Sequence, residues 1–208
     1  MADEGRPLRL GFLASHGGTN LQAIMDACKE GRLAATPCVV ISNNSASEAL
    51  KRARRESVPA YHLSQMTHPS ADDLDSAILN VLHEHRVNLV VLAGYMKRLG
   101  SLVLRRYPGR VLNIHPALLP EFGGKGMYGR AVHRAVLAAG ETETGVTVHV
   151  VDDQYDHGPI VAQSRVPVLP GDDVDRLSRR VLEREHQLFV ETLQKIESGE
   201  IDLDRLAG

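Results

Sequence analysis

Short apolar runs alternate with amphipathic segments through the first half of the chain. The apolar runs are bounded by Gly, Pro or polar residues, which predicts buried strands at 8–14, 37–42, 58–63 and 89–92. Between them, apolar residues recur at three- and four-residue spacing, which predicts helices over 21–28, 46–56 and 71–85. Because strands that alternate with helices pair in parallel, we predict a doubly wound, mostly parallel α/β sheet.

The second half of the chain extends this sheet and then closes it with a long helix. The pattern predicts a strand, a glycine-rich loop, a helix, two further strands and a final helix, at 111–115, 117–129, 131–139, 145–151, 160–167 and 173–197. In the strand at 145–151, Thr147 and His149 share one face, and we interpret His149 as a hydrogen-bonded, half-buried residue rather than a catalytic one.

The strand at 111–115 carries two polar side chains to the point where it ends. Asn113 and His115 point to one face, roughly 6–7 Å apart, while Pro116 stops the strand. In an open α/β sheet, ligands bind beyond the carboxyl ends of the strands. The pair is therefore a candidate site for one small reacting group, although a buried pair satisfied by backbone groups fits these residues equally.

A glycine turn follows the first strand and leads directly into a helix. The residues Gly17, Gly18, Thr19 and Asn20 form this turn, and Thr19 or Asn20 is expected to cap the helix. Glycines allow close backbone approach and helix N-terminal N–H groups bind anions, so the turn predicts a phosphate monoester site. It matches neither the Walker A motif nor G-x-G-x-x-G, and a tight turn without ligand is the alternative.

Composition and charge narrow the classes of function. The 208-residue chain has a net charge of −2 and two cysteines, Cys28 and Cys38, outside any C-x-x-C motif. We expect a cytoplasmic protein that binds small molecules, with no nucleic-acid or membrane partner and no disulfide scaffold. The basic helix residues at 51–55 predict a solvated face. We expect either a monomer or a homodimer.

The sequence lacks the motifs that are typical of zinc enzymes and serine hydrolases. There is no H-E-x-x-H or C-x-x-C for zinc and no G-x-S-x-G for a serine nucleophile, so we expect neither a metal nor a covalent intermediate. An Asn, a His and a downstream Asp suit direct acyl transfer. In this interpretation Asn113 and His115 stabilise an oxyanion, and the Asp favours the charged form of the imidazole.

Three stretches resemble the formyltetrahydrofolate-dependent formyltransferase family. They are the N-x-H-P-x-L-L-P element at 113–120, the strand at 145–151 with D-x-G-P at 156–159, and the Gly-Gly-Thr-Asn turn at 17–20. The similarity runs from about residue 8 to 193 and includes 89–96 and 184–186. It implies a Rossmann-like formyltransferase fold in a single domain over 1–208, with a ribonucleotide phosphate site in the N-terminal half and a folate site in the C-terminal half.

The resemblance also implies roles for individual residues. Asn113, His115 and Asp156 correspond to the catalytic residues, and Glu185 to the residue that holds the ribose hydroxyls. The resemblance implies that Gly17, Gly18, Thr19 and Asn20 bind the ribonucleotide phosphate. It implies that the folate co-substrate, 10-formyltetrahydrofolate, is bound by Met96, Lys97, Arg98, Leu99, Asn113, Val151 and Asp152.

The implied activity is formyl transfer to the amine of glycinamide ribonucleotide in purine synthesis. The alternatives are a formyltransferase acting on a sugar-nucleotide amine or on methionyl-tRNA, a formyltetrahydrofolate hydrolase, and a non-catalytic nucleotide-binding domain. The tRNA enzyme and the hydrolase carry an additional domain, for which we expect 208 residues to have no room.

The sequence departs from the family pattern in three places. The segment 121–129 is longer than the family's and is expected beside the folate and amine sites, so it places donor recognition and loop closure in question. An Arg that often helps the phosphate after the third strand is absent from 65–75, which offers only His68. His157 takes a position that is usually small or acidic, and we expect it to shift the titration of its neighbours.

Overall fold

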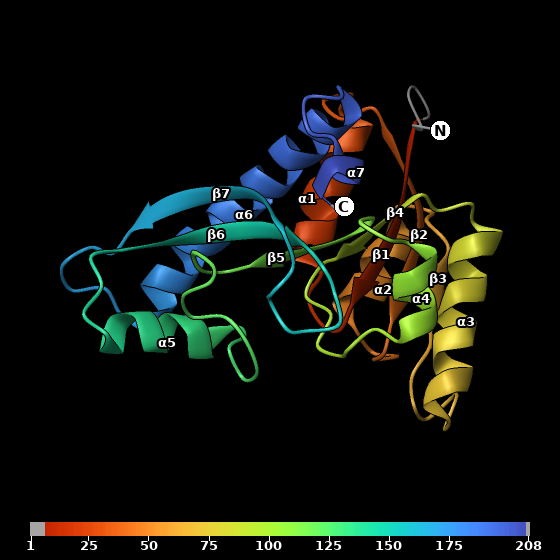
Figure 1. The fold of residues 1–208 in the computed structure, drawn as a ribbon, viewed down its shortest axis with the longest axis horizontal. Helices are drawn as coiled ribbons and strands as arrows, with labels where there is room; N and C mark the ends of the chain where they lie inside the picture. Colours follow the sequence, from red (N-terminus) through yellow and green to blue (C-terminus); the bar gives the residue numbers. More distant parts are fainter. Residues whose placement is uncertain (1–6, 207–208) are drawn as a thin grey trace.

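Seven strands form one twisted sheet in the order β3-β2-β1-β4-β5-β6-β7 (Figure 1). The structure is a computed structural model and describes residues 7–206. The first five strands pair in parallel, and β6 and β7 add to the β5 edge in antiparallel pairing. The bounds are β1 Leu8–Ala14, β2 Ala35–Ser42, β3 Ala60–His62, β4 Leu89–Leu92, β5 Val111–His115, β6 Glu143–Val150 and β7 Ile160–Pro167.

Helices cover both faces of this sheet, as the parallel connections require. One apolar layer packs α1 Thr19–Lys29, α2 Glu48–Arg55 and α6 Val174–Glu197 against the sheet. A second layer packs α3 Ala71–Glu84 and α4 Ser101–Arg106 against the opposite face. Figure 1 shows α5 Arg130–Ala138 beside the extended β5–β7 region and the short α7 Leu203–Leu206 near α1. The predicted doubly wound α/β fold is confirmed.

The strand order reverses between β1 and β4, and the loops that follow these two strands are joined there. The N–H of Ser15 donates to the carbonyl of Gly94 at 3.0 Å. The Ser15 hydroxyl in turn accepts from the N–H of Met96 at 2.7 Å. A reversal of this kind opens a crevice at the carboxyl ends of the strands, where ligands bind in such folds.

Several predicted details differ from the structure. Gly18, in a left-handed conformation, precedes α1 and supplies no side-chain cap, so the expected cap by Thr19 or Asn20 is wrong. The predicted strand at 58–63 shortens to β3, because it pairs with β2 over three residues only. Helices α4 and α7 were not predicted, since six and four residues are too short to show helical periodicity. Within residues 7–206, no helix is both long and apolar enough to cross a membrane.

Candidate active site

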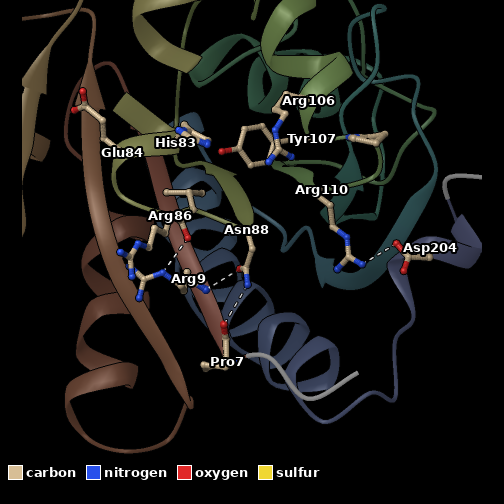
Figure 2. A pocket seen from close by; sticks show the side chains of 12 residues that line it. Pro7, Arg9, His83, Glu84, Arg86, Asn88, Arg106, Tyr107, Arg110 and Asp204 are labelled. Carbon is tan, nitrogen blue, oxygen red and sulfur yellow. Dashed lines mark hydrogen bonds and ion pairs between the residues drawn. The ribbon is translucent and has the colours of Figure 1, made fainter. Parts of the chain in front are cut away.

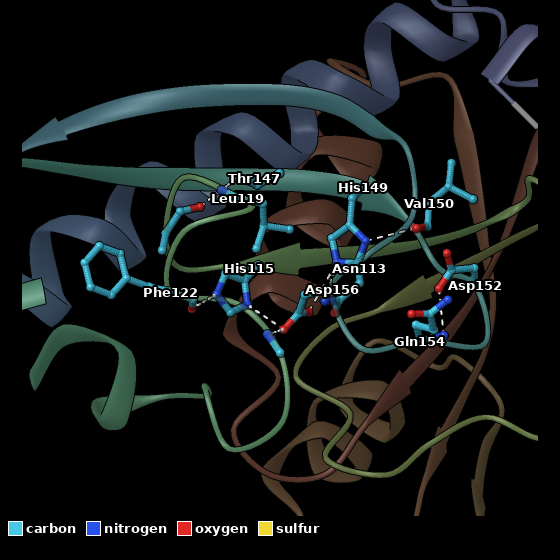
Figure 3. A network of polar contacts seen from close by, with 12 residues as sticks. Asn113, His115, Leu119, Phe122, Thr147, His149, Val150, Asp152, Gln154 and Asp156 are labelled. Carbon is cyan, nitrogen blue, oxygen red and sulfur yellow. Dashed lines mark hydrogen bonds and ion pairs between the residues drawn. The ribbon is translucent and has the colours of Figure 1, made fainter. Parts of the chain in front are cut away.

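The antiparallel pairing of β5 with β6 gathers four polar side chains on one face of the sheet. Asn113 lies opposite His149, and His115 lies opposite Thr147. Thr147 is structural, because its hydroxyl donates to the carbonyl of Ala117 and accepts from the N–H of Leu119. The other three side chains converge with Asp156, which reaches them from the loop after β6 (Figure 3).

His115 is held between a carbonyl and a carboxylate. Its Nε2 lies 2.8 Å from the Phe122 carbonyl, which can only accept, so this nitrogen carries a proton. Its Nδ1 lies 3.5 Å from Oδ2 of Asp156. Nδ1 is therefore the ring nitrogen that can gain or lose a proton during a reaction.

Burial and the neighbouring polar groups act in opposite directions on the pKa of His115. The side chain is 3% exposed, and this burial lowers its pKa below the ordinary value. Asp156 and the Phe122 carbonyl raise the pKa of the ring, but they do not outweigh burial. Asp156 thus favours the charged imidazole, as expected, but a buried imidazole loses more hydration than one carboxylate at 3.5 Å restores.

Asp156 faces both histidines and remains a carboxylate. Burial alone would raise its pKa, but the contact with His149, the nearby His115 and the N–H of Gly124 together lower it. The Gly124 N–H donates to Oδ2 at 2.9 Å. Oδ1 lies 3.6 Å from Nε2 of His149. The carboxylate is thus a fixed negative charge ready to stabilise a proton on Nδ1 of His115.

His149 orients the amide of Asn113. Its Nδ1 donates to the carbonyl of Val150 at 2.9 Å, which fixes the ring. Its Nε2 lies 3.0 Å from Nδ2 of Asn113 and 3.6 Å from Oδ1 of Asp156, so it holds the amide beside the carboxylate. Among the described residues, the Asn113 amide has no other hydrogen-bond partner, which leaves it able to donate to a ligand.

A second polar pair lies across the site, where α1 meets α6. Nδ2 of Asn20 donates to Oε2 of Glu185 at 2.7 Å, and both side chains are buried. Within the described residues, Oδ1 of Asn20 is buried without a hydrogen-bond partner. A buried polar atom left unpaired in this way costs stability, so its presence beside a cavity indicates a place for a ligand donor.

Burial of Glu185 makes the stability of the protein depend on pH. It raises the pKa of the carboxyl to about 7, against the opposing hydrogen bond from Asn20. Because this folded pKa lies above the unfolded one, stability is fully present below the unfolded pKa and is lost as the pH rises through about 7. We expect Glu185→Gln to remove this loss, on the order of 3 kcal/mol between pH 4.5 and pH 8.

Urea unfolding at several pH values measures this difference. The exposed Glu183 on the same helix provides the matched control, and Glu183→Gln should retain the wild-type pH dependence. An equal fall in stability for wild type and Glu185→Gln would show that Glu185 ionises normally in the folded protein.

A cavity of about 710 Å³ connects the two polar groups. Its walls include the catalytic candidates Asn113, His115 and Asp156 and, across the site, Asn20 and Glu185. All the residues expected to bind folate line the same cavity: Met96, Lys97, Arg98, Leu99, Asn113, Val151 and Asp152. The turn at 17–19 adjoins the cavity through its neighbours His16 and Asn20 and is not itself part of the wall.

A second cavity, of about 880 Å³, lies at the opposite ends of the strands (Figure 2). Two of its four arginines have partners within the protein: Arg9 donates to the carbonyls of His85 and Arg86, and Arg110 pairs with Asp204. It therefore has the features of a solvated surface hollow and lacks the acid and base groups of the first cavity.

The sequence missed two features of the site. His149 is hydrogen-bonded, as interpreted, but it is 2% exposed rather than half-buried, and its contact with Asn113 was not foreseen. His133 was not singled out, yet it is buried in the cavity wall, and burial lowers its pKa to about 4. The position of His133 beside a helical apolar stripe was the available signal. His157 is exposed and contacts Asp152 at 2.9 Å.

Known proteins similar to this chain belong to one enzyme family. The family model described as "Formyl transferase" matches residues 8–193. The chain is 38% identical to a phosphoribosylglycinamide formyltransferase of Haemophilus influenzae, over 96% of this chain and 92% of the relative. It is also 38% identical to a chloroplastic protein of the same name from Arabidopsis thaliana, over 93% of this chain but only 66% of that relative.

A solved structure of an enzyme with a similar name has a similar fold. The crystal structure of glycinamide ribonucleotide transformylase 1 from Symbiobacterium toebii superposes with a TM-score of 0.87 at 42% identity. The match covers 94% of this chain and 90% of that one. The fold described above is therefore shared with a solved enzyme structure.

Proposed function

Since the chain belongs to the formyl transferase family, we propose that it transfers the formyl group of 10-formyltetrahydrofolate to the amine of 5-phosphoribosylglycinamide, in purine biosynthesis. The observation that carries this proposal is the single cavity that joins the Asn113, His115 and Asp156 group to the Asn20 and Glu185 pair. One cavity with two distinct polar ends suits a reaction between two bound substrates. The location we propose is the cytoplasm.

The ribonucleotide binds at the end of the cavity formed by α1 and α6. The carboxylate of Glu185 and the free Oδ1 of Asn20 accept hydrogen bonds from ribose hydroxyls. The amide N–H groups of the turn at 17–20 hold the phosphate at the start of α1. The ribonucleotide site thus draws on residues from both halves of the chain.

The folate binds at the other end, between the loops after β4 and β6. Backbone groups of residues 96–99 and 151–152 are available there to bind the pterin edge, and the cavity wall around them includes Leu92 and Val151. Apolar walls with a few fixed polar groups are typical of small-molecule sites. This arrangement presents the formyl group to Asn113 and His115.

The reaction proceeds by direct attack of the glycinamide nitrogen on the formyl carbon. The free amide proton of Asn113 stabilises the negative charge that develops on the formyl oxygen. Nδ1 of neutral His115 accepts the proton released by the attacking amine, and Asp156 stabilises the resulting imidazolium. The bond from the formyl carbon to N10 then breaks, and N10 receives the proton, which gives the formylated amine and tetrahydrofolate.

Incubation with both substrates tests the proposal directly. Tetrahydrofolate should form in equal amount to formylated glycinamide ribonucleotide. Tetrahydrofolate released without the amine would identify a hydrolase. Turnover with a sugar-nucleotide amine, and none with glycinamide ribonucleotide, would move the protein to another acceptor.

Replacement of Glu185 tests the ribose site within this proposal. Glu185→Ala removes the acceptor for the ribose hydroxyls and leaves Nδ2 of Asn20 unpaired, so we expect KM for the ribonucleotide to rise roughly 10- to 100-fold. The KM for the folate should stay close to wild type. Initial rates at varied concentrations of each substrate separate the two effects, and an unchanged KM for the ribonucleotide would exclude Glu185 from the substrate site.

A further inference from the structure

The carbonyls of the turn after β1 are tied to α2. The carbonyl of His16 accepts the backbone N–H of Ala49 at 3.0 Å. The carbonyl of Gly17 accepts Nε of Arg52 at 2.9 Å. Gly18, with φ of +64°, packs so closely on Ala49 that an added Cβ would lie 2.8 Å from the Ala49 Cβ. The first turns of α2 therefore fix the turn on one side.

These ties decide where the amide protons point. In a trans peptide the C=O of one residue and the N–H of the next point in opposite directions. Since the carbonyls of His16 and Gly17 face α2, the N–H groups of Gly17 and Gly18 face away from it. Within residues 7–206, no acceptor in the protein takes the amide protons of residues 17–20. Four unpaired N–H groups follow one another beside the buried, unpaired Oδ1 of Asn20.

Arg52 is itself held in place, and by neutral groups. Its Nη1 donates to Oε1 of Gln22 on α1 at 3.2 Å. Nε2 of Gln22 bonds in turn to Asp26 and Glu56. Among the described residues, no carboxylate lies within ion-pair distance of Arg52. Its positive charge is therefore not paired directly with a carboxylate and adds to the attraction that the turn exerts on an anion.

From these contacts we infer that Arg52 is a positioning residue for substrate recognition, which holds the peptide between Gly17 and Gly18 so that its N–H faces the phosphate of the acceptor. The inference rests on the proposed function and deepens it. In this inference, the preference of the enzyme for a phosphorylated amine depends on Arg52, a side chain outside the cavity wall. It also supplies a cation near the phosphate in a chain whose segment 65–75 contains no arginine.

Kinetics with a phosphorylated and a dephosphorylated amine test this role. Arg52→Gln should raise KM for glycinamide ribonucleotide roughly tenfold, because one charge-assisted hydrogen bond and its orienting effect are lost. The KM for the dephosphorylated riboside, the KM for the folate and kcat with saturating ribonucleotide should each stay within about twofold. Arg52→Lys, which can still donate to the Gly17 carbonyl, should restore part of the affinity.

Arg54→Gln provides the matched control. Arg54 lies on the same helix, is exposed and carries the same charge, so its replacement should leave every constant unchanged. Equal effects of Arg52→Gln and Arg54→Gln would overturn the inference. So would an equal rise of KM for both amines, since damage to the fold does not discriminate between them. Thermal unfolding of each variant checks the fold independently.

Calorimetric titration with ribose 5-phosphate separates this inference from the proposed function. Wild type that binds ribose 5-phosphate without formyl transfer would refute the function and retain the phosphate site, and Arg52→Gln should still weaken that binding roughly tenfold. Wild type that does not bind ribose 5-phosphate would overturn the inference itself.

Discussion

Replacement of His115 with alanine is expected to lower kcat for formyl transfer roughly 100- to 1000-fold. The substitution removes the proton acceptor at Nδ1 and leaves Asp156 as a half-buried charge with fewer partners. It also frees the Phe122 carbonyl, which His115 occupies in the structure. The KM values should change less than kcat, because the ring acts mainly in the transition state.

Single-turnover rates with both substrates saturating measure this effect on the chemical step. His83→Ala is the control, because His83 is exposed on α3 and lies outside the site cavity. A near-normal rate for His115→Ala, with the fold intact, would mean that the buried ring is structural.

Replacement of Asn113 with alanine is expected to lower kcat by a similar factor, about 100-fold or more. Asn113 offers the neutral donor for the developing oxyanion, and loss of one such donor raises the barrier by about 3–4 kcal/mol. Asn113→Asp should be at least as harmful, because it places a carboxylate next to the negative charge and near Asp156. The pair of variants tests the charge of the group as well as its presence.

The contact between His149 and Asn113 leads to a further prediction. If His149 acts by orienting the Asn113 amide, His149→Ala should lower kcat less than Asn113→Ala, and the double variant should equal Asn113→Ala alone. Asn80→Ala, at an exposed position of α3, is the control. Additive losses in the double variant would show that the two residues act separately.

Most of the fold was predictable because its elements are long and locally determined. The strand over Ile160–Pro167 was expected as the chain's return from the polar loop before it, and the long helix α6 follows directly from a repeating apolar stripe. The prediction that Asn113 and His115 share a face at a strand end also follows from local geometry, and the pairing in the sheet confirms it.

The parts of the site that were missed depend on contacts between distant segments. The alternation in β6 placed Thr147 and His149 on one face, but only the register with β5 puts His149 opposite Asn113. Likewise, Asn20 and Glu185 are 165 residues apart, and their hydrogen bond exists only because α1 packs on α6. Glu185 was assigned a role through family resemblance, and the local signal was only that it interrupts the apolar stripe of α6 between Val181 and Leu188.

Arg52 differs from the other basic residues of α2, although the general prediction of a solvated face is correct for its neighbours. Lys51, Arg54 and Arg55 are exposed, as predicted for a solvated face. Arg52 shares their composition but is half-buried, because α2 lies against the turn after β1 and directs this one side chain to the Gly17 carbonyl. Charge alone could not separate it from its neighbours.

In the described part of the chain, the hydrogen bonds from the segment after Pro120 to His115 and Asp156 come from its main chain. The Phe122 carbonyl meets His115 and the Gly124 N–H meets Asp156. Nearly every amino acid has a backbone carbonyl and a backbone N–H group. Substitutions of the neighbouring side chains at Lys125, Met127 and Tyr128 therefore leave these contacts of His115 and Asp156 in place. Variation there is free to retune which folates are accepted while the chemistry is inherited unchanged.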